Sequence, residues 1–160
     1  MSRLVVLDSG PLGLLVMDPK GKKARGTPAA ARCVVWVDRL VETGTIVAIP
    51  EIIRFELRRE LVLKGFAVSL ERLDELCYSL AFSPIADPVM DRASDLWAEV
   101  RRRGKPTADD KALDVDAILA AQALVEAEAG QWDQVIIATT NVEHLSRFPG
   151  VKAEPWERIL

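Results

Sequence analysis

The sequence predicts a single α/β domain over residues 1–160, in which helices cover both faces of a central, mainly parallel sheet of four to five strands. Two observations lead to this three-layer α/β/α prediction. Short apolar runs rich in β-branched residues alternate with longer segments of helical periodicity, and strands separated by helices pair in parallel through right-handed crossovers. In addition, 160 residues is the size of one ordinary domain.

Four short segments are expected to form the strands. Residues 4–7 (LVVL) are apolar throughout, which indicates a strand buried on both faces, as in a parallel sheet. Residues 46–49 (IVAI) and 135–139 (VIIAT) have the same character. Residues 151–153 are expected to form a last strand at the edge of the sheet.

The segments between these strands have helical periodicity and helix-ending residues. A helix over residues 50–64 would end before Gly65, and Pro88 suits the first turn of a helix that runs to residue 103. In the helix of residues 29–42, Val34, Val37 and Val41 are expected to share an apolar face, with Leu40 beside it. Further helices are expected at residues 12–16, 69–81 with Ser69 as N-cap, 114–129 and 141–148, and a mobile loop at residues 18–28.

Composition limits the class of protein. The chain is 49% hydrophobic and 28% charged with a formal net charge of -3, which fits a soluble globular domain and lacks the basic excess usual in nucleic-acid-binding domains. Cys33 and Cys77 lie in apolar segments and are expected to be reduced core residues. The sequence has neither a signal peptide nor a membrane-spanning run, so we expect a cytoplasmic protein without membrane contact.

Polar side chains follow the predicted strands at the edge where parallel sheets bind ligands. Asp8 follows the first strand, Glu56 lies in the helix after the second, and Asn141 follows the third. Asp114 and Asp116 begin the long helix. Converging carboxylates repel one another and require a counter-charge, and oxygen ligands suit Mg²⁺ or Mn²⁺. The single histidine excludes a zinc site built from histidines and cysteines.

Each of these residues also has a structural interpretation. Asp8 suits an Asx turn, Glu56 an ion pair on the surface, and Asn141 a helix cap. Asp114 and Asp116 suit the first turn of a helix, where the dipole favours acids. Four further acids, Glu51, Glu60, Asp109 and Asp110, are expected to be loop or helix-end charges. His144 is expected at the surface or partly packed, and Trp36, Trp97, Trp132 and Trp156 in the core or an interface.

Taken together, four segments resemble the motifs of PIN domains. Residues 7–12 (LDSGPL) resemble the opening L-D-T/S-x-x-L/I motif, and residues 50–57 (PEIIRFEL) the second motif, which ends on an acidic ligand. Residues 116–123 (DAILAAQA) are similar to the D-x-x-I-A-A-x-A motif, which is the most specific of the four. Residues 137–141 (IATTN) resemble the last one, a hydrophobic residue followed by A-T-x-D/N. Residues 149–156 also look like the last strand of the family, so the resemblance spans nearly the whole chain.

The resemblance implies a PIN-like fold and an endoribonuclease of the VapC type, the toxins of bacterial and archaeal toxin–antitoxin pairs. It implies that Asp8, Glu56 and Asp116 are catalytic acids that bind Mg²⁺ or Mn²⁺, with Asp114 as an additional acid. Asn141 occupies the fourth catalytic position, where many members carry an acid. One metal ion is therefore expected, and a second is left open.

The resemblance also implies partners and neighbouring groups. RNA would be the substrate, an antitoxin protein would bind the chain, and the chain would form a homodimer. Ser9 and Thr139 would supply hydroxyl groups that hold the acids or a metal-bound water.

Local basic side chains offer contacts for a phosphate backbone despite the negative net charge. They are Arg54, Arg58 and Arg59, the run at residues 101–105, and the loop at residues 20–25. The structural alternative for each is an ordinary solvated surface charge.

Two other classes of protein remain as alternatives. A PIN-fold module that binds RNA or a protein without useful catalysis is motivated by Asn141 and by the net charge of -3. A phosphotransfer enzyme or receiver domain is disfavoured by two positions. A haloacid-dehalogenase phosphatase would need a second acid two residues after Asp8, where the chain has Gly10. A receiver domain would need a lysine near the end of the third strand, where none occurs until Lys152.

Overall fold

A computed structural model describes residues 2–18, 28–104 and 110–160, with residues 110 and 111 described by their backbone alone. Several features expected from the sequence therefore lie outside the described residues. These are the basic loop at residues 20–25, Lys105 of the basic run, Asp109, and the side chain of Asp110.

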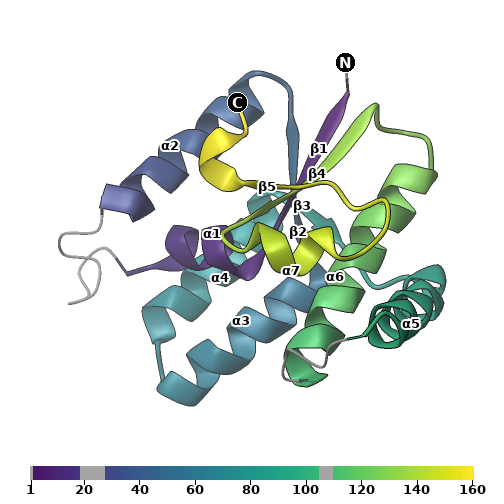
Figure 1. Ribbon diagram of the computed structural model, residues 1–160. Helices are drawn as coiled ribbons and strands as arrows, with labels where there is room; N and C mark the ends of the chain where they lie inside the picture. Colours follow the sequence, from purple (N-terminus) through teal and green to yellow (C-terminus); the bar gives the residue numbers. More distant parts are fainter. Residues whose placement is uncertain (1, 19–27, 105–109) are drawn as a thin grey trace.

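The centre of the molecule is a five-stranded parallel sheet with helices on both faces (Figure 1). The strands lie in the order β3-β2-β1-β4-β5, and every neighbouring pair is parallel. This arrangement confirms the predicted three-layer α/β/α class. The strands are β1 (Arg3–Leu7), β2 (Ile46–Pro50), β3 (Ala81–Ser83), β4 (Gln134–Thr139) and β5 (Ala153–Pro155).

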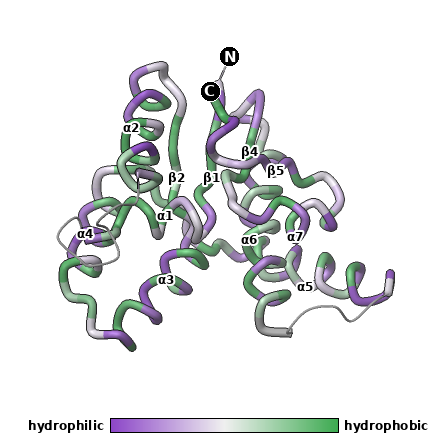
Figure 2. The backbone as a smooth tube through the Cα atoms, turned by 60° about the vertical axis from the view of Figure 1, so that its left-hand side comes forward, coloured by the Kyte–Doolittle hydropathy of each residue, from purple (hydrophilic) through white to green (hydrophobic). Residues whose placement is uncertain are grey.

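Seven α-helices and one 3₁₀ helix cover this sheet in the described parts of the chain. They are α1 (Ser9–Val16), α2 (Pro28–Glu42), α3 (Glu51–Lys64), α4 (Ala67–Ser79), α5 (Asp87–Arg102), α6 (Asp110–Glu128), α7 (Val142–Ser146) and η1 (Trp156–Arg158). Figure 2 shows hydrophobic residues concentrated along β1 and β2 in the middle of the molecule.

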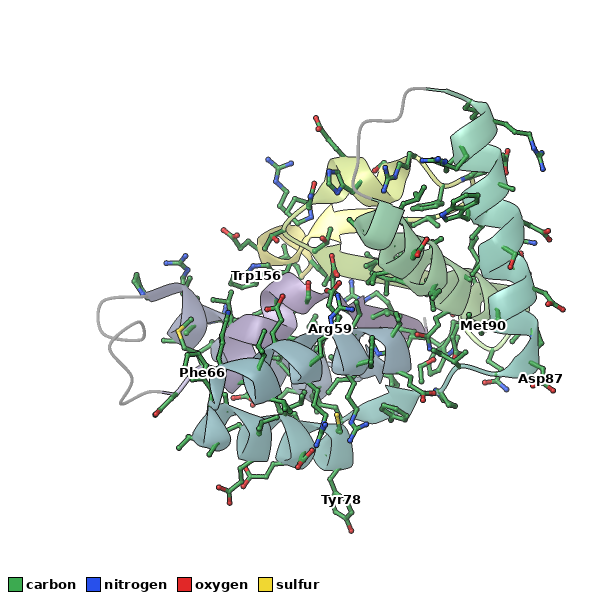
Figure 3. The ribbon with its side chains drawn as sticks, turned by 90° about the horizontal axis from the view of Figure 1, so that it is seen from below. Arg59, Phe66, Tyr78, Asp87, Met90 and Trp156 are labelled. Carbon is green, nitrogen blue, oxygen red and sulfur yellow. The ribbon has the colours of Figure 1, made fainter. Side chains whose placement is uncertain are left out.

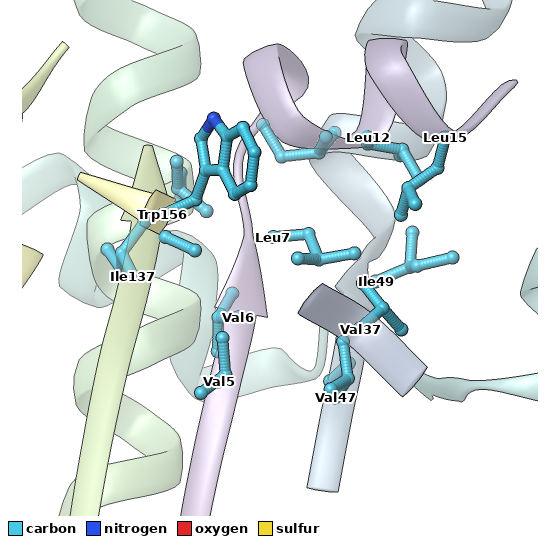
Figure 4. Packing of buried hydrophobic residues seen from close by; sticks show 14 of the residues in the cluster. Val5, Val6, Leu7, Leu12, Leu15, Val37, Val47, Ile49, Ile137 and Trp156 are labelled. Carbon is cyan, nitrogen blue, oxygen red and sulfur yellow. The ribbon is translucent and has the colours of Figure 1, made fainter. Parts of the chain in front are cut away.

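The core is centred on β1. All four residues from Leu4 to Leu7 are at most 3% exposed, so both faces of the strand are covered. Val5 is level with Val47 on β2 and with Ile136 on β4. Figure 4 shows β1 and β2 packed beneath Leu12 and Leu15 of α1, with Trp156 beside them. Because side chains on both faces of β1 are buried, residues 4–7 are all apolar and do not alternate between apolar and polar.

The C-terminus is tied to α2 by two tryptophans. The rings of Trp36 and Trp156 lie 5.4 Å apart between centroids, at an interplanar angle of 57°. Trp36 Nε1 donates a hydrogen bond of 2.8 Å to the carbonyl of Ile159. The predicted core location is confirmed for these two residues, which are 8% and 4% exposed.

Both cysteines are free, as predicted. Cys33 is fully buried and Cys77 partly so. Burial raises the pKa of the Cys33 thiol to about 12, so it stays protonated and unreactive at neutral pH. None of the described helices is long and apolar enough to cross a membrane.

Four expectations about individual elements were wrong. The helix α4 begins at Ala67 after Phe66, and Ser69 is buried within it instead of capping it. On α2 the buried face is Cys33, Trp36, Val37 and Leu40, whereas Val34 and Val41 are exposed. The helix α6 begins four residues earlier than expected. The sequence also failed to predict β3, which has only three residues and begins at Ala81, where the preceding helix was expected to end.

A buried glutamine joins the two helices that carry Glu56 and Asp116. Gln122 of α6 is 1% exposed. Its Oε1 accepts a hydrogen bond of 3.2 Å from the backbone N–H of Ile52 at the start of α3, and its Nε2 donates one of 2.7 Å to the carbonyl of Ser83 at the end of β3. Because both ends of the amide are used, Gln122 holds α6, α3 and β3 in one arrangement.

We predict that Gln122→Leu destabilises the protein. The substitution leaves a buried N–H and a buried carbonyl without their partner, which costs about 2 kcal/mol and lowers the melting temperature by about 4–8 °C. Thermal unfolding followed by circular dichroism measures this change. Gln131→Leu is the matched control, because Gln131 is exposed. Equal melting temperatures for the two variants would contradict the assigned role.

Candidate functional site

Asp8 is fixed between two neighbouring strands at the C-terminal edge of the sheet. It follows β1 and caps α1, and its Oδ1 accepts a hydrogen bond of 2.7 Å from the backbone N–H of Ser9. Its Oδ2 accepts one of 2.7 Å from Thr139 Oγ1, at the end of β4. Since β4 pairs directly with β1, the sheet itself brings this hydroxyl to the carboxylate.

Thr139 also positions the chain that follows it. It is fully buried, and its Oγ1 accepts a hydrogen bond of 2.9 Å from the backbone N–H of Asn141. One hydroxyl therefore connects Asp8 to the loop that carries Asn141. Asn141 stands at the N-cap of α7 but makes no capping hydrogen bond with its side chain, so its predicted structural use as a cap is not realised.

Glu56 lies on the half-buried side of α3. Burial raises the pKa of Glu56, a hydrogen bond with Ser9 lowers it, and the negative charge of Asp8 raises it again. Ser9, at the start of α1, thus contacts Asp8 through its backbone and Glu56 through its side chain.

Asp116 is the most perturbed acid of the group. Burial and the nearby charge of Asp8 raise its pKa from 3.8 to about 6, although Arg147 and His144 act in the opposite direction. Arg147 Nη2 lies 3.0 Å from Asp116 Oδ2, and His144 Nδ1 lies 3.7 Å from the same oxygen. Both basic residues come from α7 or the residue after it, so α7 supplies the partial counter-charge for this carboxylate.

The side chains share one pocket of about 230 Å³. It opens where the ends of β1 and β4 meet α3, α6 and α7. The predicted site residues Asp8, Glu56, Asp116 and Asn141 all line it. The remaining lining residues are Ser9, Ala112, Thr140, His144 and Leu145. We refer to it as the acid pocket.

Asp114 does not line the acid pocket. It is exposed and lines a separate depression of about 340 Å³ between α5 and α6, together with Trp97 and Ile118. Two residues along a helix correspond to a rotation of about 200°, so Asp114 and Asp116 face opposite sides of α6. The earlier start of α6 also removes Asp114 from the helix terminus.

Gly10 is required by a close approach of α1 to the loop after β4. A Cβ atom at this position would lie 2.6 Å from Thr140 Oγ1 and 2.8 Å from its Cγ2. Both distances are too short for non-bonded atoms, so a larger residue would push Thr140 away from the acid pocket. In the sequence, Gly10 appeared only within the motif of residues 7–12 and as the position where a second acid is absent.

The structure adds two basic residues that sequence analysis did not connect with the acids. His144 was expected at the surface, and its side chain is indeed 47% exposed, yet it also lines the acid pocket. Arg147 carried no expectation at all. Its guanidinium carbon lies 5.4 Å from the centroid of the buried ring of Phe148, which helps to hold it against Asp116. The only sequence signal that could have linked His144 and Arg147 was their spacing of three residues, which places two side chains on the same side of a helical turn.

The side-chain oxygens that line the acid pocket are of the chemical type that binds a hard divalent cation. Asp8, Glu56 and Asp116 offer only carboxylate oxygens, the ligands that Mg²⁺ and Mn²⁺ prefer. Burial first, and then the negative charge of Asp8, raise the pKa values of Glu56 and Asp116. In the described part of the chain, however, no three acidic, histidine or cysteine side chains are gathered closely enough to enclose an ion. Asp116 is instead directed to Arg147 and His144.

Three solved structures with a similar fold are of VapBC complexes. A chain of VapBC2 from Rickettsia felis, bound to a DNA fragment from its promoter, has a TM-score of 0.71 and 16% identity over 96% of this chain and 98% of that chain. A chain of VapBC-1 from nontypeable Haemophilus influenzae has a TM-score of 0.63 and 14% sequence identity, over 97% of this chain and 99% of that chain. A chain of DNA-bound VapBC from Salmonella typhimurium has a TM-score of 0.59 and 18% identity, over 98% of this chain and 99% of that chain.

The resemblance to VapC-type PIN domains is thereby confirmed at the level of the fold. No protein-family model and no curated protein matches the chain in sequence. At 14–18% identity, the likeness establishes the three-layer PIN-like architecture, while the roles of individual residues stay predictions.

We predict that Asp116→Asn stabilises the metal-free protein at pH 7.5. Folding raises the pKa of Asp116 from 3.8 to about 6, so this group costs stability increasingly as the pH rises through that interval and costs the full amount above it. The cost is at most roughly 3 kcal/mol, and its removal should raise the melting temperature by up to about 10 °C. Asparagine retains an oxygen that can accept from Arg147.

The measurement is thermal unfolding in the presence of a chelator at pH 7.5 and at pH 4. The difference between Asp116→Asn and wild type should be large at pH 7.5 and small at pH 4. Asp95→Asn, at an exposed position of α5, should match wild type at both. A difference that does not depend on pH would count against the raised pKa.

Proposed function

We propose that this chain is a metal-dependent endoribonuclease that hydrolyses phosphodiester bonds of RNA. The observation that carries the proposal is the convergence of Asp8, Glu56 and Asp116, from three separate elements, in one acid pocket. Building such a pocket is costly in the absence of a cation, because burial and mutual repulsion raise the pKa values of Glu56 and Asp116.

In this proposal Asp8, Glu56 and Asp116 hold Mg²⁺ or Mn²⁺. Such an ion, when bound, lowers the pKa of a ligand water and stabilises negative charge that develops on phosphoryl oxygens. Asp8 suits the role because its carboxylate is held at both oxygens by Ser9 and Thr139. The predicted contribution of Asp114 would require a change in its position, since it faces the depression beside α5.

The remaining groups of the acid pocket suit contacts with the phosphate backbone. Asn141 offers amide N–H donors at the exposed rim, and Thr140 offers a hydroxyl. The exposed basic residue Arg59 of α3 lies close enough to Glu56, which lines the pocket, for its charge to act on that carboxylate. Arg54 is less available, because it pairs with Asp74 at 4.0 Å.

We further propose that the chain acts as the toxin of a toxin–antitoxin pair in the cytoplasm, binds an antitoxin protein, and forms a homodimer. Support comes from the PIN-type motifs and from the VapBC complexes that share its fold. A catalytically weak module that binds RNA or a protein is the second candidate. It is favoured by the amide of Asn141 in the fourth position and by the dispersed arrangement of the acids in the described structure.

Cleavage of labelled RNA by the purified protein tests the enzymatic proposal. Single-stranded and structured RNAs should be cut in the presence of Mg²⁺ or Mn²⁺ and left intact with a chelator. Asp8→Asn and Asp116→Asn should each lower the rate at least about 100-fold, because loss of a carboxylate ligand weakens metal binding.

Asp95→Asn, which removes an exposed carboxylate of α5, provides the matched control and should cleave as wild type does. Equal cleavage by wild type, Asp8→Asn and Asp116→Asn would rule out the proposed mechanism. Binding of RNA without cleavage under all metal conditions would favour the second candidate.

A further inference from the structure

An exposed aromatic side chain stands next to the acid pocket. Phe55 directly precedes Glu56 on α3, and it is 55% exposed. The neighbouring residues Ile53 and Leu57 are 0% and 9% exposed and anchor α3 to the core. Phe55 therefore contributes little to packing. A single exposed apolar side chain is ordinary on a protein surface, so the role of Phe55 depends on what surrounds it.

Arg59 lies between Phe55 and Glu56 on the helix surface. It follows Phe55 by four residues and Glu56 by three, and both spacings place side chains side by side on an α-helix. The guanidinium carbon of Arg59 is 5.3 Å from the centroid of the Phe55 ring. Its charge also reaches the carboxylate of Glu56, where it partly offsets the rise in pKa that burial causes. Figure 3 shows Arg59 on α3, between this helix and the α6 side of the molecule.

Arg59 is not committed to an ion pair within the described ranges. No carboxylate there lies within 4.0 Å of it, in contrast to Arg54, which pairs with Asp74, and Arg92, which pairs with Glu128 at 2.9 Å. Phe55 and Arg59 are thus an exposed ring and an exposed cation in contact with each other. Both are neighbours on α3 of Glu56, which lines the acid pocket.

We propose that Phe55 and Arg59 form a stacking site for a nucleobase of single-stranded RNA, next to the phosphate that occupies the acid pocket. The inference rests on the proposed function and extends it to the class of substrate. Aromatic rings and arginine planes bind unpaired bases through stacking that tolerates any sequence, and arginine adds attraction to the backbone. A base inside a duplex is stacked on both faces by its neighbours and cannot also stack on Phe55. The site therefore favours single-stranded RNA over duplex RNA as the ligand.

A protein partner is the competing occupant of this surface. Further along α3, Val62 and Leu63 are 50% and 86% exposed, and Phe66 follows them at 44%. That part of the surface is apolar, whereas the part formed by Phe55 carries the exposed cations Arg58 and Arg59 and borders the acids. The positive charge complements a polyanion, which is why RNA is the better match at Phe55.

The test compares four variants of the full chain on short single-stranded RNAs with Mn²⁺. Phe55→Ala and Phe55→Leu should raise KM about tenfold, because both lose the ring that stacks on a base. Phe55→Trp should keep the KM of wild type, and so should the control Leu63→Ala, at an exposed apolar position of the same helix. Changes in kcat should be much smaller than changes in KM.

Substitution of single nucleotides by abasic ones identifies the stacked base. Wild type should lose affinity at one abasic position near the cleavage site, and Phe55→Ala should show no such loss. If Phe55→Ala retains the KM of wild type, the stacking site is refuted while the ribonuclease proposal stands. Dissociation of an oligomer by Phe55→Ala, seen by sedimentation with KM unchanged, would assign the surface to a protein contact and also refute it.

Should wild type cleave no RNA, the proposed function fails, and the stacking site is judged by binding. Fluorescence anisotropy with the same labelled single strands then decides. Binding that is about tenfold weaker for Phe55→Ala than for Leu63→Ala supports the site, and equal binding refutes it.

Discussion

The burial of the carboxylates of Glu56 and Asp116 in one pocket beside Asp8 is the constraint on which the organisation of this molecule depends. The fold brings three acids from β1, α3 and α6 into one pocket, and burial leaves two of them with raised pKa values. The chain offsets part of this cost itself, through the hydroxyl of Thr139 on Asp8 and the guanidinium of Arg147 on Asp116. A divalent cation would meet the rest.

The architecture keeps these acids together through a small number of buried polar contacts. The pairing of β1 with β4 brings Thr139 to Asp8. Gln122 lies on the same helix as Asp116, and its side chain binds the backbone of Ile52 in the first turn of α3. Glu56 lies further along that helix. Gly10 allows α1 to approach Thr140. Stability and function are therefore linked, because the contacts that position the acids are also contacts between the layers of the fold.

Much of this organisation could be predicted from the sequence. The continuous apolar run at residues 4–7 predicted a doubly covered strand, and the motif at residues 116–123 placed Asp116 in the pocket together with Asp8 and Glu56. Local periodicity could not predict β3, which has only three residues. Nor could it predict where α6 begins, which decides that Asp114 faces away from the acid pocket. Arg147 and His144 were missed because their relation to Asp116 is a tertiary contact across 31 and 28 positions of the chain.

Calorimetric titration of the metal-free protein with Mn²⁺ measures whether the acids form a metal site without requiring a substrate. We expect saturable binding of one ion per chain at pH 7.5, weakened at least about 100-fold by Asp8→Asn. We also expect weaker binding at pH 5, where Asp116, with its pKa raised to about 6, is largely protonated. Absence of binding, or binding that Asp8→Asn leaves unchanged, would contradict a metal site formed by these acids.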